Sequence, residues 1–342
     1  MNIKRLNLNN KKTCVILGAG ASRGASCFEK TWIQPPLDAD FFAQAQNLAS
    51  NDTSGILKEL LEFVKEEFDP TLSIPMEKLF TQIEALDSFH TAVKIDRGPR
   101  MKRYGNVLEK FTSAVATIFD LLAKECPGKK ATCSYHEALV GCIETGDAIL
   151  SFNYDCLIDE ALKKNGRKSW NPETGYGFSV TGGADHWRPP SAKGRAAGAP
   201  IALLKLHGSL NWDRGTMDEL HLRDKPYDAA TRHGSEIVPP VWNKRIESDP
   251  LLIAVWKQAR NALRDADVIV VIGYSIPDTD LLTQALLRVA PVEDDSGLTH
   301  LVVVNPDAAV RQKCLGVFRQ ALDSKTVVLQ FKDLRAFSEV LA

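Results

Sequence analysis

Long hydrophobic runs and a targeting signal are missing from this 342-residue chain. No stretch of about 18 apolar residues occurs, and the first twelve residues, MNIKRLNLNNKK, are polar and lack an apolar signal core. Both absences argue against a membrane-bound or secreted protein, so we expect a soluble, cytoplasmic protein with no membrane partner. The length suffices for one large domain or two moderate ones.

An excess of charge of one sign is also missing. The chain has 42 Lys and Arg against 43 Asp and Glu, which gives a net charge of -1. Such a balance produces no overall electrostatic attraction to nucleic acid. A short basic stretch such as Arg100–Arg103 is typical of a solvated surface, so we expect no direct nucleic-acid binding.

Paired cysteines are the third absence. The seven cysteines are scattered along the chain, and none forms a CxxC pair. This spacing argues against a zinc ribbon and against a disulfide framework, and it favours a reducing compartment. We therefore expect no metal site.

The N-terminal region contains a strand-and-turn pattern. An apolar run over Cys14–Gly18 predicts a buried strand that leads into a tight turn. Gly18 and Gly20 have no Cβ, so the backbone can turn sharply against a bulky ligand. The small residues from Ala21 onward can begin a helix, whose N-terminus suits a phosphate. Gly24, however, falls one position late for the GxGxxG fingerprint, and a plain βα connection has the same appearance.

The pattern between residues 41 and 145 is almost wholly helical. Segments 55–68, 75–89 and 106–124 each place apolar side chains on one face at helical spacing. No segment of this region resembles a strand. We predict a helical insertion over 41–145, with the surrounding domain formed by 1–40 and 146–342.

From residue 146 onward apolar strands alternate with helices. Strands are predicted at 148–152, 201–206, 267–273, 299–304 and 326–331. Helices are predicted at 156–165, 250–266, 281–289, from 307 and at the end of the chain. Residues 168–200 are expected to form a long loop or a hairpin, and the stretch before 236 is expected to be irregular. This alternation predicts an α/β fold with a doubly wound parallel sheet.

Polar and small residues follow five of the predicted strands, where ligands bind in such sheets. These strand ends are Gly18-Ala19-Gly20, Asn153-Tyr154-Asp155, His207-Gly208-Ser209, Gly273-Tyr274-Ser275 and Asn305-Pro306. Each has a structural explanation when taken alone. Asn153 could form an Asx turn, Asp155 could cap a helix, and His207 could be a buried core histidine. Five such ends together favour a binding site.

These motifs resemble those of the sirtuin family. GAGAS, SFNYD, KLHGS, IGYS and VVVNP, in this order, are similar to its glycine loop, TQNID-type turn, LHGS, GTS-type turn and asparagine turn. The specific part is LHGS with Asn-x-Asp. PPLDADFF, IVPPVWNK and GYSIPDTD further resemble the bacterial sirtuin-like proteins of antiphage defence. The resemblance implies a Rossmann-like sirtuin fold and an NAD-cleaving effector controlled by a partner or by oligomerisation.

The chain also departs from the protein-deacetylating sirtuins. Its cysteine spacing does not match their four-cysteine zinc module. The FGE and GIPDFR motifs are absent, and IVPPVWNK and PPLDADFF lie near the corresponding positions. Phe152 and Tyr154 replace the usual glutamine and isoleucine.

The resemblance implies hydrolysis of NAD+ to nicotinamide and ADP-ribose without a metal. It implies that Asn153 orients the ribose or a water, that Asp155 holds the nicotinamide carboxamide, and that His207 accepts a proton. The further NAD-binding positions that it implies are Gly18, Ala19, Gly20, Ser22, Gly208, Gly273, Ser275 and Asn305.

Other functions remain open at this point. One is a zinc-less protein deacylase or ADP-ribosyltransferase, and another is a silent module that senses NAD or ADP-ribose. The presence of both Asn153 and His207 argues against the silent module. A dehydrogenase would need an acidic residue for the adenosine ribose, for which Asp38 is the candidate.

The implied activity also bears on partners. Because a constitutive NADase would harm its own cell, we expect a homo-oligomer and a separate regulatory protein. A hexameric DNA-translocating ATPase or an Argonaute-like protein would suit this role.

Overall fold

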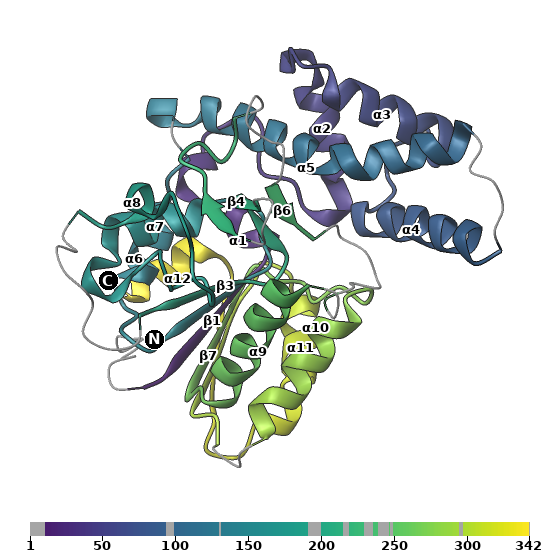
Figure 1. The fold of residues 1–342 in the computed structure, drawn as a ribbon. Helices are drawn as coiled ribbons and strands as arrows, with labels where there is room; N and C mark the ends of the chain where they lie inside the picture. The colour runs from purple at the N-terminus through teal and green to yellow at the C-terminus, as the bar shows by residue number, and fades with distance from the viewer. Residues whose placement is uncertain are drawn as a thin grey trace.

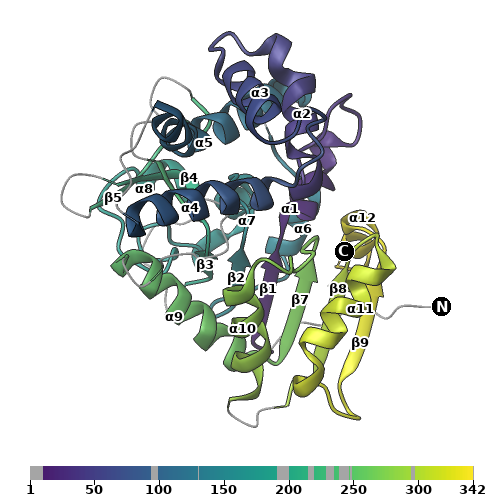
Figure 2. The same cartoon turned by 90° about the vertical axis from the view of Figure 1, so that its right-hand side faces the viewer.

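The computed structural model describes residues 11–93, 99–129, 131–190, 200–214, 219–228, 235–238, 246, 249–293 and 297–341. A layered α/β part and a helical block make up the molecule, and the helical block lies beyond the carboxyl ends of the strands (Figures 1 and 2). None of the described helices combines the length and the apolar character needed to cross a membrane.

The α/β part is built on a six-stranded parallel sheet, which confirms the predicted fold class. Its strands are β1 (Thr13–Leu17), β2 (Ala148–Ser151), β3 (Ala202–Lys205), β7 (Val268–Ile272), β8 (His300–Val304) and β9 (Val327–Phe331). Their order is β3-β2-β1-β7-β8-β9, as Figure 2 shows from left to right. The chain therefore reverses its direction of winding between β1 and β7, where ligands bind in doubly wound sheets.

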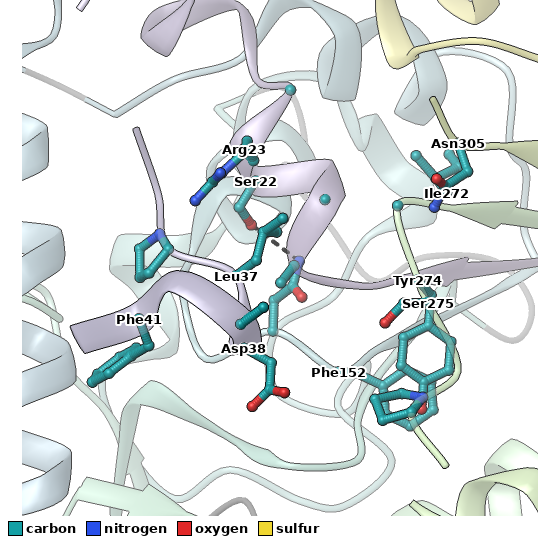
Figure 3. A pocket seen from close by; sticks show the side chains of 18 of the residues that line it. Ser22, Arg23, Leu37, Asp38, Phe41, Phe152, Ile272, Tyr274, Ser275 and Asn305 are labelled. Atoms are coloured by element: carbon teal, nitrogen blue, oxygen red, sulfur yellow. Dashed lines mark hydrogen bonds between the residues drawn. The ribbon is translucent and has the colours of Figure 1, made fainter. Parts of the chain in front are cut away.

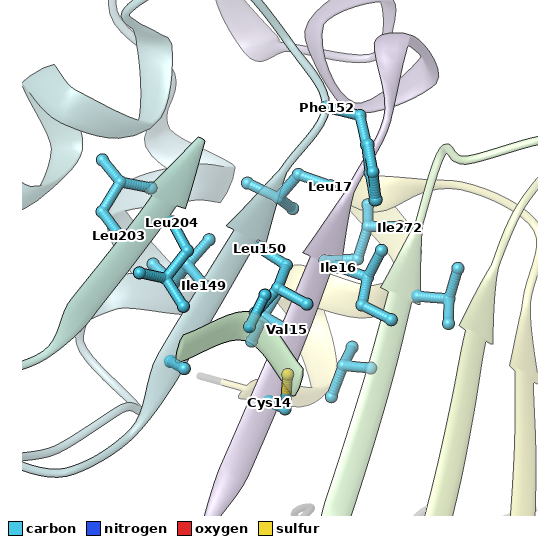
Figure 4. Close-up of a cluster of buried hydrophobic side chains, with 14 of the residues drawn as sticks. Cys14, Val15, Ile16, Leu17, Ile149, Leu150, Phe152, Leu203, Leu204 and Ile272 are labelled. Atoms are coloured by element: carbon cyan, nitrogen blue, oxygen red, sulfur yellow. The ribbon is translucent and has the colours of Figure 1, made fainter. Parts of the chain in front are cut away.

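The strand sequences are continuously apolar because both faces of the sheet are covered. Every residue of β1, β2 and β7 is buried. Figure 4 shows Val15 and Ile16 of β1 packed beside Ile149 and Leu150 of β2. These central strands form the middle of the main core.

Two groups of helices cover the sheet. On one face lie α1 (Ala19–Arg23), α6 (Ser134–Val140), α7 (Leu157–Asn165) and α12 (Leu334–Leu341). On the other lie α9 (Pro250–Arg264), α10 (Leu281–Val289) and α11 (Ala308–Val317). Each helix of the second group begins at an aspartate whose carboxylate accepts from backbone N–H groups of the first turn, namely Asp249, Asp280 and Asp307.

The helical block consists of α2 (Phe41–Leu48), α3 (Ile56–Glu67), α4 (Met76–Ala92) and α5 (Pro99–Glu125). Its apolar faces form a second core, and the described part of residues 41–145 contains no strand. Helix α6 falls inside the predicted insertion, yet it packs on α7 and α12, with Leu139 and Val140 in the core of the sheet. The boundaries at 41 and 145 remain predictions.

A small antiparallel sheet was not expected from the sequence. It contains β4 (Gly208–Arg214), β5 (Leu220–Leu222) and β6 (Ser235–Ile237), in the order β5-β4-β6. Two of its strands have only three residues, too few for a period-two pattern to stand out. The loop predicted over 168–200 holds the short helix α8 (Ala184–Trp187), and most of IVPPVWNK lies outside the described residues.

The central strands should dominate stability. We expect Leu150→Ala, at a fully buried position in β2, to lower the free energy of unfolding by about 2–5 kcal/mol, because it leaves a cavity in the core on one face of the sheet. Urea denaturation measures this loss. Leu281→Ala, at a half-exposed position in α10, is the matched control and should change stability little. Equal losses from the two variants would contradict the assignment of the core.

Candidate functional site

A cavity of about 550 Å³ lies at the carboxyl ends of the central strands. One wall consists of residues that follow β1, β2, β7 and β8, and the opposite wall includes Met76 of α4 and Val115 and Phe119 of α5. The cavity thus lies between the sheet and the helical block, at the point where the winding reverses. Figure 3 shows Phe152, Tyr274 and Asn305 on one side of the cavity and Asp38 and Phe41 on the other.

Most of the residues predicted for the site line this cavity. They are Ala19, Gly20, Ser22, Asn153, Asp155, His207, Gly273, Ser275 and Asn305. Gly18 and Gly208 are not part of its lining. Gly18 packs against Tyr274, and Gly208 begins β4 with a φ of 75°, a backbone conformation that favours glycine.

The glycines at the turn after β1 are required by a contact between two turns. A Cβ on Gly18 would lie 2.5 Å from Tyr274 Cα, and one on Gly20 would lie 2.8 Å from Gly273 Cα. The N–H groups of Gly18 and Gly20 donate to the carbonyls of Ile272 and Gly273 at 3.0 and 2.8 Å. The N–H groups of Gly18 and Gly20 therefore form hydrogen bonds within the protein. The phosphate cradle predicted from the sequence did not include these bonds.

Asn153 is held at the cavity wall by two hydrogen bonds. Its Nδ2 donates to Gly18 O and to Ser22 Oγ, both at 3.0 Å. Its Oδ1 is buried and has no hydrogen-bond partner among the described residues. A buried acceptor left in this state costs about 1–3 kcal/mol, so this atom is suited to accept from a hydroxyl group of a ligand or from water.

Asp155 supports this arrangement from behind. Its Oδ2 accepts from Ser22 Oγ at 2.6 Å, and its Oδ1 accepts from Leu157 N at 3.0 Å, at the start of α7. The N-cap of α7 is Cys156, so Asp155 precedes the cap position and accepts from the first helical N–H instead. Because both oxygens have partners, the carboxylate orients Ser22, which in turn orients Asn153. A contact of Asp155 with a nicotinamide carboxamide remains a prediction.

His207 lies in an aromatic and acidic environment. Its ring meets that of Phe152 edge to face, with centroids 5.1 Å apart, and Phe152 stacks on Tyr274 at 4.4 Å. His207 Nε2 lies 3.6 Å from Asp280 Oδ2, which also accepts from Tyr274 Oη at 3.0 Å. Asp280 was not among the site residues predicted from the sequence. Its position in the GYSIPDTD motif is the signal that could have identified it.

Carboxylates surround Tyr154 beside the cavity. Burial raises the pKa of Tyr154, and the carboxylates of Glu77, Asp280 and Asp38 raise it further. Burial also raises the pKa of Asp38, against a hydrogen bond from Glu77 N at 2.7 Å. Asp38, Glu77 and Asp280 line the cavity together with Tyr154.

A fully buried ion pair supports the strand ends. Lys205, at the end of β3, donates to Asp155 O at 2.6 Å and to Asp159 Oδ2 at 3.1 Å. Tyr176 and Asn211 donate to the other oxygen of Asp159. Burial alone would lower the pKa of Lys205, but Asp159, Cys156 and Asp155 together outweigh this effect, so the pKa lies above its ordinary value. The pair ties the turn after β2 to the segment that carries His207.

Breaking this pair should be costly. Lys205→Met leaves the Asp159 charge buried without its counter-ion, so we expect a loss of about 3–5 kcal/mol in the free energy of unfolding, measured by urea denaturation. The double variant Lys205→Met/Asp159→Asn removes both charges and should lose less. Lys164→Met, which breaks an exposed pair with Glu137, should cost about 1 kcal/mol or less. A double variant as unstable as Lys205→Met would contradict this account.

Comparison with known proteins gives one result. The family model for the SIR2-like domain matches residues 147–320, just over half of the chain. The matched region runs from the start of β2 past β8 and includes Asn153, His207 and Asp280. No curated protein matches the chain. Within the described residues, no group of three or more His, Cys, Asp or Glu side chains could hold a metal ion.

Proposed function

The chain belongs to the SIR2-like family, whose domains generally act on NAD, and on this premise we propose that it is an NAD+ glycohydrolase. The proposed reaction is the cleavage of NAD+ by water into nicotinamide and ADP-ribose. The observation that carries the proposal is the placement of Asn153 Oδ1, buried and without a partner among the described residues, in the same cavity wall as His207.

The chemistry sets clear demands on such a site. Nicotinamide leaves ribose C1′ as a neutral molecule and takes the bonding electron pair with it. Positive charge then develops on the ribose, and the oxygen of water forms the new bond to C1′ while its proton passes to a base. The protein must therefore hold the sugar, stabilise the positive charge and accept one proton.

The residues present meet these demands. Asn153 Oδ1 would accept a hydrogen bond from a ribose hydroxyl or from the water, in an orientation set by Gly18 and Ser22. His207 would accept the proton, since a neutral imidazole suits this role near neutral pH. Asp280, 3.6 Å from Nε2, would stabilise the imidazolium that forms. The stacked rings of Phe152 and Tyr274 offer a flat apolar surface beside the same position.

The test is NAD+ consumption by the purified protein, with the products separated by chromatography. We expect wild type to release nicotinamide and ADP-ribose, and His207→Ala to slow the reaction about 10²- to 10⁴-fold through loss of the base. Asn153→Ala should be impaired as strongly because the ribose or water is no longer oriented. His221→Ala, at an exposed histidine of β5, is the matched control and should keep full activity.

Two outcomes would contradict the proposal. NAD+ that binds but stays intact would favour the sensor of NAD or ADP-ribose instead. Transfer of the ADP-ribosyl group to a protein would favour the transferase, and transfer of an acyl group from a protein lysine to ADP-ribose would favour the deacylase.

We further propose that the enzyme is a cytoplasmic antiphage-defence effector that depletes NAD+ and is held in check by assembly. The support is the resemblance of its motifs to defence proteins and the toxicity of unregulated NAD+ loss. A hexameric DNA-translocating ATPase or an Argonaute-like protein would be its regulatory partner.

Assembly leads to a separate prediction. Size-exclusion chromatography with light scattering should show a homo-oligomer, or a complex once the partner is added, and activity should follow the assembled fraction. A stable monomer with full NADase activity would contradict regulation by assembly, while the proposed reaction would stand.

A further inference from the structure

The polar groups of the glycine turn after β1 already have partners within the protein. The N–H groups of Gly18, Gly20 and Ala21 all donate to backbone carbonyls. The hydroxyl of Ser22 donates its one hydrogen to Asp155 Oδ2 at 2.6 Å. A glycine turn at the start of a helix commonly binds phosphate through such groups. Here these four donors could reach a phosphate only by giving up a hydrogen bond that stabilises the turn.

Arg23 offers a donor that the turn itself does not. It is the last residue of α1, and it is the one lysine or arginine among the described residues that line the cavity. Carboxylates such as those of Asp307 and Asp333 line the cavity as well. A phosphate group would therefore be repelled there unless a positive charge lay beside it. Within the described lining, Arg23 is the side chain with a permanent positive charge.

Three hydrogen bonds hold the guanidinium of Arg23 in place. Its Nε donates to Pro35 O at 2.7 Å, and its Nη2 donates to both oxygens of Asp40, at 2.8 and 2.6 Å. Its Nη1 has no hydrogen-bond acceptor among the described residues, and the side chain is 24% exposed. A guanidinium held in this way can present its remaining two N–H groups to a ligand with little further loss of side-chain freedom.

The ion pair with Asp40 is compatible with such a contact. Asp40 also accepts from Leu37 N at 2.7 Å and from Gln44 Nε2 at 3.3 Å, so its negative charge is shared among three donors. A guanidinium has five N–H donors in one plane, so it can bind a carboxylate along one edge and a phosphate along another. Asp40 therefore acts as the support that orients Arg23.

We infer that Arg23 binds the pyrophosphate of NAD+, in place of the backbone N–H groups of the glycine turn. The inference rests on the proposed function only in that NAD+ is the ligand. It also gives a role to the PPLDADFF segment, residues 35–42, which supplies both acceptors that hold the guanidinium. Asp40 is a positioning residue in this arrangement, and Arg23 is the residue that touches the ligand.

The test compares a ligand that has the pyrophosphate with one that lacks it. The probes are ADP-ribose, measured by calorimetry, and adenosine, measured by NMR titration; the proposed reaction cleaves neither. We expect wild type to bind ADP-ribose at least about tenfold more tightly than adenosine. Arg23→Gln should weaken ADP-ribose binding about 10- to 100-fold, because a hydrogen bond to a charged group is lost, and should leave adenosine binding unchanged.

Two further variants serve as comparisons. Arg23→Lys keeps the charge but not the planar set of donors, so it should lose less ADP-ribose affinity than Arg23→Gln, and it is a second variant should Arg23→Gln not fold. Arg288→Gln makes the same chemical change at an exposed position of α10 outside the cavity lining and should alter neither affinity. Thermal unfolding checks that each variant is folded.

Three results would overturn the inference. Equal losses of ADP-ribose and adenosine binding would show that Arg23 only supports the shape of the cavity. Folded Arg23 variants that bind ADP-ribose as tightly as wild type would show that it makes no contact with the pyrophosphate. Wild type that binds ADP-ribose no more tightly than adenosine would overturn the inference without reference to any variant.

The outcome for the reaction is read separately. Wild type that releases nicotinamide, while Arg23→Gln keeps the affinity for ADP-ribose, would overturn the inference and support the proposed function. ADP-ribose binding that depends on Arg23, with no nicotinamide released by wild type, would support the inference and overturn the hydrolase.

Discussion

The site depends on the close contact between the turns that follow β1 and β7. Gly18 and Gly20 lie against Tyr274 and Gly273 so closely that a side chain on either glycine would collide with backbone atoms. Hydrogen bonds between the two turns align them where the winding of the sheet reverses. This contact places Gly18 O where Asn153 can donate to it, and it places Tyr274 where it stacks on Phe152. The positions of Asn153 and of Tyr274 in the cavity wall thus both depend on glycine at 18 and 20. The protein's own packing explains this requirement without a ligand.

Hydrogen bonds between polar groups behind the cavity wall fix the orientation of the Asn153 side chain. The amide of Asn153, the hydroxyl of Ser22 and the carboxylate of Asp155 form a continuous chain of hydrogen bonds that ends at the start of α7. Lys205 donates to the backbone carbonyl of Asp155 and so links this chain to the fully buried Asp159. Within the part of the chain that the structure describes, each member has a partner except Asn153 Oδ1, and Asn153 lines the cavity. A network satisfied everywhere else leaves one acceptor for a ligand or water.

The sequence predicted those features that depend on local patterns. The helix 281–289 has the predicted bounds, and α9 begins at the predicted residue 250 with Asp249 as its cap, because apolar periodicity and capping are properties of neighbouring residues. The sequence also predicted that Asn153 and His207 lie at the same site, since parallel strands bring their carboxyl ends to one edge of the sheet. The contact of Glu77 with Thr279 did not follow, because the two residues are 202 positions apart in the chain. Nor did the pairing of β4 with β6, whose register is irregular.

The two cores of the molecule are joined at the residue that follows Asn153. Tyr154 is buried in the core of the helical block, where its ring meets the edge of Phe111 of α5 at 6.1 Å. Its hydroxyl donates to Val238 O at 2.8 Å, and its carbonyl accepts from Leu210 N in β4. Tyrosine at this position therefore ties the turn that carries Asn153 to the block and to the small sheet. The turn that carries Asn153 is thus in contact with the helical block and with the small sheet, so the position of this turn depends on the packing of both cores.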